Sequence, residues 1–332
     1  MVADGVHTYY GYDAANKMTS PGTFDYDVKG NMHSHIIDGV TTEYTWDLQN
    51  RMVQWEKTNE TTETYLYNAD GMRVRKTPNG GTQTDFLLDI DEIAEEITGS
   101  SIVSYVGPQL ISRIDGETRT IYHADGIGST RALSDSTQAV AQAEIYDAYG
   151  NRLTTSGQAP NFGFAGEYRY YADATGLDYL KARYYDSTAG RFISRDPMGY
   201  WGGFNLYAYG KDRPTSFVDP RGLFEIDPGD SNESCKKGCK EGYEDCKDIV
   251  GFGVLIGTGA AAGAGVVCSV VATPVVGGLV AGGVECCVLT AGGSTWAGCF
   301  VGYKRCLRDC DELFPPPNCS GGGGNPGGGS GW

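Results

Sequence analysis

The sequence predicts a mainly β fold, an antiparallel meander built from repeats, followed by a small helical hairpin rich in cysteine, glycine and alanine. Two observations predict it. Phrases with paired aromatic residues and an Asp or Asn recur through the chain before Leu223, and all ten cysteines come after it. With 332 residues the chain has room for one to three domains.

The recurring phrases predict strands joined by turns. "EYTWDLQNRM", "TYLYNADGMRVRKT" and "EIYDAYGNRL" alternate aromatic or β-branched residues with polar ones, as half-buried strands do. "NADGM" and "DAYGN" have the composition of turns, so a repeat of roughly 20 residues makes one hairpin. We expect Tyr to pack between strands and Asp to cap the turns, with no chemistry assigned to either. The acidic stretch "IDEIAEEITG" fits a short helix or an edge strand.

Charge and the N-terminus limit the function classes. The net charge of −16 does not favour nucleic-acid binding, which needs clustered Lys and Arg, so no nucleic-acid partner is expected. The start "MVADGVHTYYGYD" has no signal-peptide pattern and begins inside a repeat, which suggests the end of a longer protein or a truncated gene. The four histidines have no metal-ligand spacing, and we expect neither a metal nor a cofactor.

A specific resemblance begins near Tyr122. The string "GLDYLKARYYDSTAGRFISRDP", with "NLYAYGKDRPTSFVDPRGL" after it, resembles the core-associated region of RHS/YD-repeat proteins, and the earlier phrases are similar to YD repeats. The resemblance covers about two-thirds of the chain. It implies a β-sheet that spirals into a hollow shell, a core region that closes one end and cuts the chain, and a variable toxin or effector after the cut. This chain has too few repeats to enclose anything alone.

The resemblance and the composition together divide the chain into four parts. The expected parts are a YD-repeat sheet region at 1–121, part of a β-shell; a core-associated domain with a self-cleavage motif at 122–223; a Cys-rich hydrophobic variable tail at 224–319; and a disordered Gly-rich end at 320–332.

Two similar motifs provide the candidate chemistry, "RDPMG" at Arg195–Gly199 and "DPRGL" at Asp219–Leu223. Asp-Pro-x-Gly also fits a type I β-turn, so a purely structural role is the alternative. Two close carboxylates that share a proton can hydrolyse a peptide bond. The resemblance implies that Asp196 and Asp219 are these carboxylates and that the cut falls between Leu223 and Phe224. Arg195 is the neighbouring cation that would orient a carboxylate or stabilise an oxyanion.

The tail carries two cysteine triplets whose spacings mirror each other. Intervals of 4 and 7 residues in the first become 7 and 4 in the second, which places each triplet on one face of a helix. Antiparallel helices would align three disulfides, which suits an oxidising compartment. Cys-only zinc is the alternative, although it usually needs CxxC spacing. The candidate pairs are Cys235 with Cys310, Cys239 with Cys306, and Cys246 with Cys299.

Between the triplets the run Ile249–Val284 carries no charge. It is long enough for a single membrane span or a tight hairpin, and its small residues would allow close helix contact in lipid. A soluble buried hairpin with bonded cysteines is the alternative. No histidine follows Leu223, so a common HNH-type nuclease or zinc deaminase is not expected in the tail.

Two functions from different classes fit these observations. The first is a self-processing carrier, an intramolecular aspartyl autoprotease that releases a membrane-active effector. Its expected partners are its own upstream RHS shell or secretion machinery, a lipid bilayer and an immunity protein. The second is a non-cleaving cell-surface YD-repeat scaffold whose hydrophobic tail anchors it in a membrane. Both imply a secreted or cell-surface protein.

Overall fold

The computed structural model describes residues 2–3, 6–7, 9–60, 62–107, 109–155, 159–229 and 240. The expected helical hairpin, its six paired cysteines, the apolar run Ile249–Val284 and the Gly-rich end all lie outside the described residues. Within the described part of the chain, no helix is long and apolar enough to cross a membrane.

A sheet of fourteen strands dominates the structure, and each strand pairs antiparallel with the next one along the chain. The mainly β, antiparallel prediction is therefore confirmed. The strands of this sheet are β5 (Thr23–Tyr26), β6 (Met32–Ile37), β7 (Val40–Trp46), β8 (Met52–Lys57), β9 (Glu63–Tyr67), β10 (Arg73–Pro78), β11 (Thr84–Asp89), β12 (Glu92–Thr98), β13 (Ser101–Val106), β14 (Ser112–Asp115), β15 (Thr118–Ala124), β16 (Thr130–Ser134), β17 (Val140–Tyr146) and β18 (Arg152–Thr155).

The remaining elements are shorter. A four-stranded sheet contains β19 (Tyr171–Ala172), β20 (Asp178–Leu180), β21 (Arg183–Asp186) and β22 (Arg191–Phe192). Two-stranded pairs are formed by β1 (Val2–Ala3) with β2 (Val6–His7) and by β3 (Gly11–Tyr12) with β4 (Met18–Ser20). Short 3₁₀ helices are η1 (Gly166–Tyr168), η2 (Gly199–Gly202) and η3 (Gly210–Asp212).

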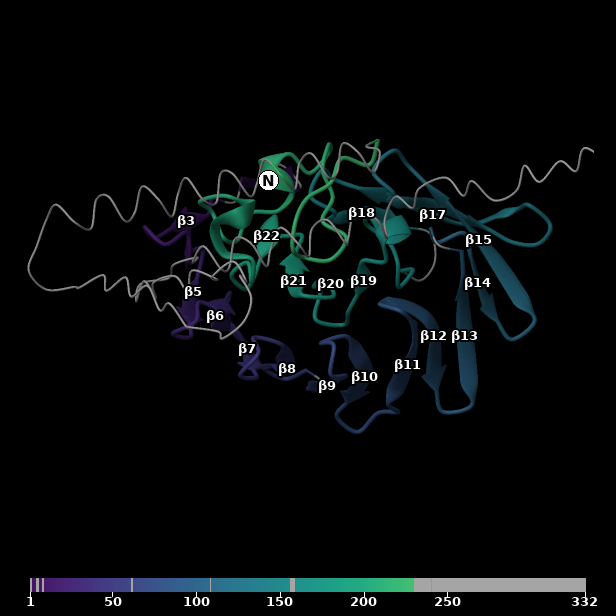
Figure 1. Ribbon diagram of the computed structural model, residues 1–332, viewed down its shortest axis with the longest axis horizontal. Coiled ribbons are helices and arrows are strands. Elements are labelled where there is room, and N and C mark those ends of the chain that lie inside the picture. Colours follow the sequence, from purple (N-terminus) through teal and green to yellow (C-terminus); the bar gives the residue numbers. More distant parts are fainter. Residues whose placement is uncertain are drawn as a thin grey trace, which may run out of the picture.

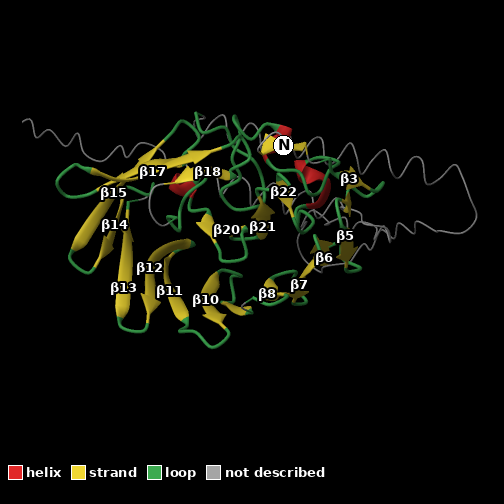
Figure 2. Ribbon diagram, turned by 180° about the vertical axis from the view of Figure 1, so that it is seen from behind, coloured by secondary structure: helices red, strands yellow, loops and turns green. Residues whose placement is uncertain are grey.

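The large sheet bends into an open arc. From β5 to β18 its strands follow a curve, and β19 to β22 lie on the concave side (Figures 1 and 2). We call residues 159–229 the inner module. It holds one of the two clusters of buried hydrophobic side chains and contributes to the other, which lines the arc. The sheet thus forms a wall around the module.

The repeated Asp explains why the chain turns where it does. Asp27 Oδ1 accepts the backbone N–H of Lys29 at 2.9 Å and of Asn31 at 2.8 Å, which closes the turn between β5 and β6. The expectation that Asp caps these turns is confirmed. The same pattern, with bonds from the residues two and four positions on, recurs at Asp47, Asp125, Asp135 and Asp147.

For the stretch "IDEIAEEITG" we expected a short helix or an edge strand, but it lies inside the sheet. It forms the turn between β11 and β12 and then β12, which pairs with β11 on one side and β13 on the other. Two of its acidic side chains, Glu92 and Glu96, bind residues of the inner module, which is why a charged strand is stable there. Glu96 accepts hydrogen bonds from Tyr105 Oη at 2.5 Å and Asn161 Nδ2 at 2.8 Å.

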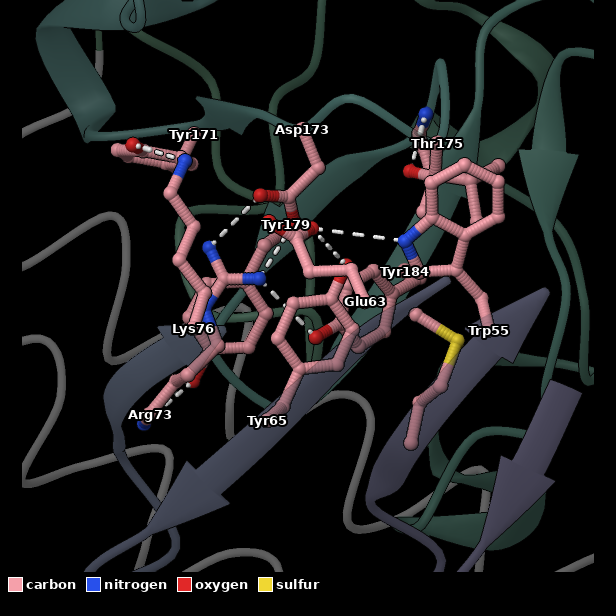
Figure 3. Close-up of polar contacts among 12 residues, drawn as sticks. Trp55, Glu63, Tyr65, Arg73, Lys76, Tyr171, Asp173, Thr175, Tyr179 and Tyr184 are labelled. Atoms are coloured by element: carbon pink, nitrogen blue, oxygen red, sulfur yellow. Dashed lines mark hydrogen bonds and ion pairs between the residues drawn. The ribbon is translucent and has the colours of Figure 1, made fainter. Parts of the chain in front are cut away.

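A buried ion pair joins the wall to the inner module. Arg73 on β10 binds Asp173, which follows β19, with both side chains fully buried (Figure 3). A second bond runs from Arg73 Nη2 to Asp173 Oδ1 at 3.1 Å. Five aromatic rings surround the guanidinium at 4.2–6.0 Å, and this cation–π cage replaces its lost hydration. The rings are those of Tyr65, Phe86, Tyr171, Tyr179 and Tyr184.

Candidate active site

The Asp-Pro-Arg-Gly-Leu motif forms a closed loop in the inner module, which we call the cleavage loop, residues 218–226. Its ends pair as an antiparallel bridge, with Val218 N donating to Ile226 O at 3.0 Å and Ile226 N to Val218 O at 2.8 Å. Gly222 N donates to Asp219 O at 3.3 Å, which is the bond of a β-turn. The predicted turn is therefore present, and it presents the predicted scissile bond just after it.

Glycine is required at the fourth position of this turn. Gly222 has φ of +67°, in the left-handed region. A Cβ there would lie 2.8 Å from Leu180 O and 3.0 Å from Arg183 N, which is too close for a real contact. The turn therefore packs directly on the backbone between β20 and β21.

Asp219 touches both residues of the predicted scissile bond. Its carboxylate is fully buried, and Oδ1 accepts the N–H of Leu223 at 2.8 Å and of Phe224 at 3.1 Å. The second of these nitrogens is the leaving group if the bond between Leu223 and Phe224 is cut. Tyr170 Oη accepts the N–H of Asp219 itself at 2.5 Å. One carboxylate oxygen is thus held within hydrogen-bond distance of the atom that must be protonated.

Arg183 on β21 brings the two predicted aspartates together. Its Nη2 lies 2.8 Å from Asp219 Oδ2 and 3.2 Å from Asp196 Oδ2, and all three side chains are buried or nearly so. Arg183 Nε also donates to Gly222 O at 2.5 Å, and the guanidinium lies 3.5 Å from the centre of the Phe192 ring. The carboxylates therefore share one cation beside the loop.

Sequence reasoning missed Arg183 and singled out Arg195 instead. The signal was present, because a cation in the aromatic strand "ARYYD" of an inner sheet needs a carboxylate partner. Arg195 lies elsewhere. Its side chain packs against Gly30 in the β5–β6 turn and interacts with Tyr207. The orienting role of Arg195 stays a prediction. The cation that lies against both aspartates is Arg183.

Burial raises the pKa of both carboxyls, and a third carboxyl, Glu225, raises the pKa of Asp196 as well. Burial raises the pKa of Asp196 to about 7, against the lowering effect of Arg183 and of a hydrogen bond from Met198 N, and the nearby Asp219 raises it further. Burial also raises the pKa of Asp219, while Arg183 and the two loop amides oppose this. Arg183 offsets only part of this negative charge, so near neutral pH the Asp196 carboxyl retains a proton in part of the molecules.

A cavity of about 700 Å³ adjoins the loop. Leu223, Arg221, Pro197 and Ala182 line it from the inner module, together with Lys181 and Tyr184, and residues of the wall line the rest. A space of this size with charged side chains can hold water, the second substrate of a hydrolysis. Among the residues with described structure, no group of three or more His, Cys, Asp or Glu could hold a metal ion.

The fold defines the class: this is a β-repeat protein with repeated hairpins, an inner module and an Asp-Pro-Arg-Gly-Leu loop. Sequence relatives point to the family. No protein-family model matches the chain. The tRNA3(Ser)-specific nuclease WapA of Bacillus spizizenii is 33% identical over 230 residues, and the match covers 64% of this chain and 10% of that one. The double-stranded DNA deaminase toxin A of Burkholderia cenocepacia is 30% identical, covering 60% and 17%. The probable deoxyribonuclease RhsB of Dickeya dadantii is also 30% identical, covering 54% and 14%.

The chain is an RHS-repeat protein. It spans between 10% and 17% of the length of these three relatives. Their names as nucleases and a deaminase count against the expectation that nucleic acid is not a partner. Among solved structures, a TcdB2-TccC3-Cdc42 complex aligns with a TM-score of 0.48 at 19% identity, over 64% of this chain and 15% of that one.

Proposed function

We propose that the chain is the C-terminal part of an RHS-repeat toxin and cuts itself between Leu223 and Phe224 by an aspartyl mechanism. One observation carries the proposal. Asp219 accepts the N–H groups of both residues that this peptide bond joins, and it shares Arg183 with Asp196, so the scissile bond and two carboxyls of raised pKa lie in one buried site. Asp196 also caps its own turn through Met198 N, but that turn does not require its carboxyl to share Arg183 with Asp219.

The chemistry follows from the shared proton. Water adds to the carbonyl carbon of Leu223 while the ionised carboxyl accepts a water proton, and the protonated carboxyl donates to the carbonyl oxygen. The tetrahedral intermediate collapses when a proton reaches the nitrogen of Phe224 and the C–N bond breaks. Asp219 already contacts that nitrogen. The products are a carboxylate at Leu223 and an amine at Phe224. Tethering keeps the substrate at high effective concentration.

The wider role rests on the relatives. Several are toxins or nucleases by name, which supports delivery of a toxic segment after the cut. In this proposal residues 1–121 and 122–223 form the repeat and core regions, and residues 224–319 are the variable effector. An upstream shell or secretion machinery, a bilayer as target of the apolar run, and an immunity protein are its proposed partners. The protein is proposed to be secreted or exposed at the cell surface.

Denaturing electrophoresis with mass spectrometry tests the cut. We expect wild-type protein to give two pieces, the second beginning at Phe224. Asp196→Asn and Asp219→Asn keep the shape of the side chain but cannot run carboxylate acid–base chemistry, so each should slow cleavage about 100-fold or more. Asp147→Asn, at a turn on the wall, is the control and should cleave normally. A single wild-type band would favour the non-cleaving scaffold, and cutting by either site variant would exclude that carboxyl.

A further inference from the structure

The wall forms an ion pair with the cleavage loop at the tip of the hairpin between β11 and β12. The turn between β11 and β12 consists of Ile90 and Asp91. Asp91 Oδ2 lies 2.7 Å from Nη2 of Arg221, the variable residue of the Asp-Pro-x-Gly-Leu motif. Both side chains are sheltered, 16% and 13% exposed, so water weakens this pair less than it would an open surface pair.

A second ion pair lies beside the first. Glu92 Oε1 is 2.7 Å from Nζ of Lys181, which is also 3.8 Å from Asp91 Oδ2. Lys181 lies at the corner between β20 and β21, where the cleavage loop packs. Two adjacent carboxylates of the wall therefore face cations of the inner module, and the charges are complementary. We call these four residues the wall clamp.

The wall clamp connects to the candidate active site through the backbone. Ala182 N donates to Arg221 O at 3.1 Å, and the next residue, Arg183, donates from Nε to Gly222 O. A shift of Arg221 would therefore move Gly222 relative to the cation that holds both aspartates. At the hairpin tip Ile90 has φ of +57°, a conformation that β-branched residues seldom adopt.

We propose that Asp91 is a positioning residue for self-cleavage, and that the wall holds the loop in its reactive geometry through Arg221. This inference rests on the proposed function. Asp91 acts at a distance from the reacting atoms, and its effect passes through Arg221, Ala182 and Gly222. The consequence is that the cut depends on the hairpin of β11 and β12 being folded over the loop. The acidic stretch that sequence analysis left without a function thereby acquires one.

A double-mutant cycle on cleavage rate tests the inference. The uncut chain is collected in denaturant, refolded with reductant, and sampled over time on denaturing gels. Asp91→Asn and Arg221→Gln should each slow cleavage about tenfold, because small misplacements near a reacting bond are costly. The double variant should be no slower than either single variant, since both remove the same contact. Arg221→Lys, which keeps the charge, should recover most of the rate.

Further measurements distinguish a positioning role of Asp91 from an effect on folding and from a direct part in the cleavage reaction. Asp85→Asn breaks an ion pair with Arg75 on the same wall, away from the loop, and should leave the rate unchanged. In an Asp219→Asn background, adding Asp91→Asn should shift the thermal midpoint by no more than about 2 °C, because one ion pair at the tip of a hairpin contributes little to the stability of the whole fold. The pH profile of the Asp91 variant should keep the wild-type midpoints.

The outcomes distinguish two failures. If Asp91→Asn cleaves at the wild-type rate while Asp219→Asn is inert, the proposed function stands and the positioning role is wrong. If the rate falls only together with a large loss of thermal stability, Asp91 is structural and the inference is overturned. If wild-type chain is never cut, the proposed function fails, and this inference falls with it.

Discussion

At the scale of single residues, the same feature occurs twice: an arginine buried together with its carboxylate partner. Arg73 and Arg183 are both almost completely inaccessible, and each is bound to at least one carboxylate and lies against at least one aromatic ring. The sequence motifs identified Asp196 and Asp219, because a turn can be recognised from a few consecutive residues. They could not identify Arg183, whose role depends on β21 lying beside a loop that comes 36 residues later.

The pKa of Asp196 predicts how cleavage depends on pH. Its value of about 7 lies above the usual range of a carboxyl, so the proton needed by the acid is present below about pH 7 and is lost above it. The refolding cleavage rate should therefore fall as pH rises past 7. It should also fall at acidic pH, when both carboxyls are protonated and no base remains. Rates measured from pH 4 to 9 check this, and a rate that keeps rising to pH 9 would contradict the shared proton.

Arg73 predicts a large effect on stability. Arg73→Ala would leave Asp173 buried without its cation, which costs about 3–5 kcal/mol in comparable cases. Urea unfolding in the uncut Asp219→Asn background measures the free energy. Arg73→Met combined with Asp173→Asn removes both charges and should recover part of the loss. If the double variant is as unstable as Arg73→Ala, the aromatic cage rather than the unpaired charge accounts for the cost.

At the scale of elements, the turn Asp and the alternating strands were readable from sequence because both are local. A carboxylate that accepts two backbone N–H groups of its own turn requires nothing from distant parts of the chain. The strand β12 was misjudged because its acidic residues suggested solvent. Their partners Tyr105, Asn161 and Lys181 lie in other elements, and no spacing within the strand reveals them.

The turns allow a direct test at this scale. Asp147 Oδ1 accepts the N–H of Tyr149 and of Asn151, both at 2.9 Å. Asp147→Ala removes the acceptor and should lower the free energy of unfolding by about 1–3 kcal/mol. Asp147→Asn retains an oxygen in the same place and should cost less. Urea denaturation of both variants in the uncut background compares them, and equal costs would mean that charge, rather than the acceptor, stabilises the turn.

At the scale of the whole molecule, cutting and releasing are separate events. Phe224 and Ile226 lie beyond the predicted cut, yet both are buried in the hydrophobic cluster of the inner module. Ile226 also keeps its two backbone bonds to Val218. Cleavage of one peptide bond removes none of these contacts, so the new N-terminus should remain docked after the reaction.

This docking predicts a specific chromatographic result. Cleaved protein should give two bands on denaturing gels but elute as one species in native size exclusion. Ile226→Asp places a charge in the cluster and should separate the pieces after cleavage, because an unpaired buried charge is costly. Asp227→Asn, at an exposed neighbour, is the matched control. Separation of the wild-type pieces in buffer alone would show that the buried contacts are too weak to retain the segment.

The order of the strands along the chain determines when during synthesis the cut can occur. Each strand of the arc pairs with the one just made, so a growing chain can build the wall progressively from its N-terminal end. The loop partners Asp91, Tyr170, Arg183 and Asp196 all precede Asp219 in the chain. In the proposed function, the wall and most of the inner module are therefore synthesised before the peptide bond enters its site, and only the last residues of the loop, such as Ile226, follow it. Cleavage of a chain would therefore be evidence that its wall had folded. A chain that stays uncut would be one whose folding had stopped earlier.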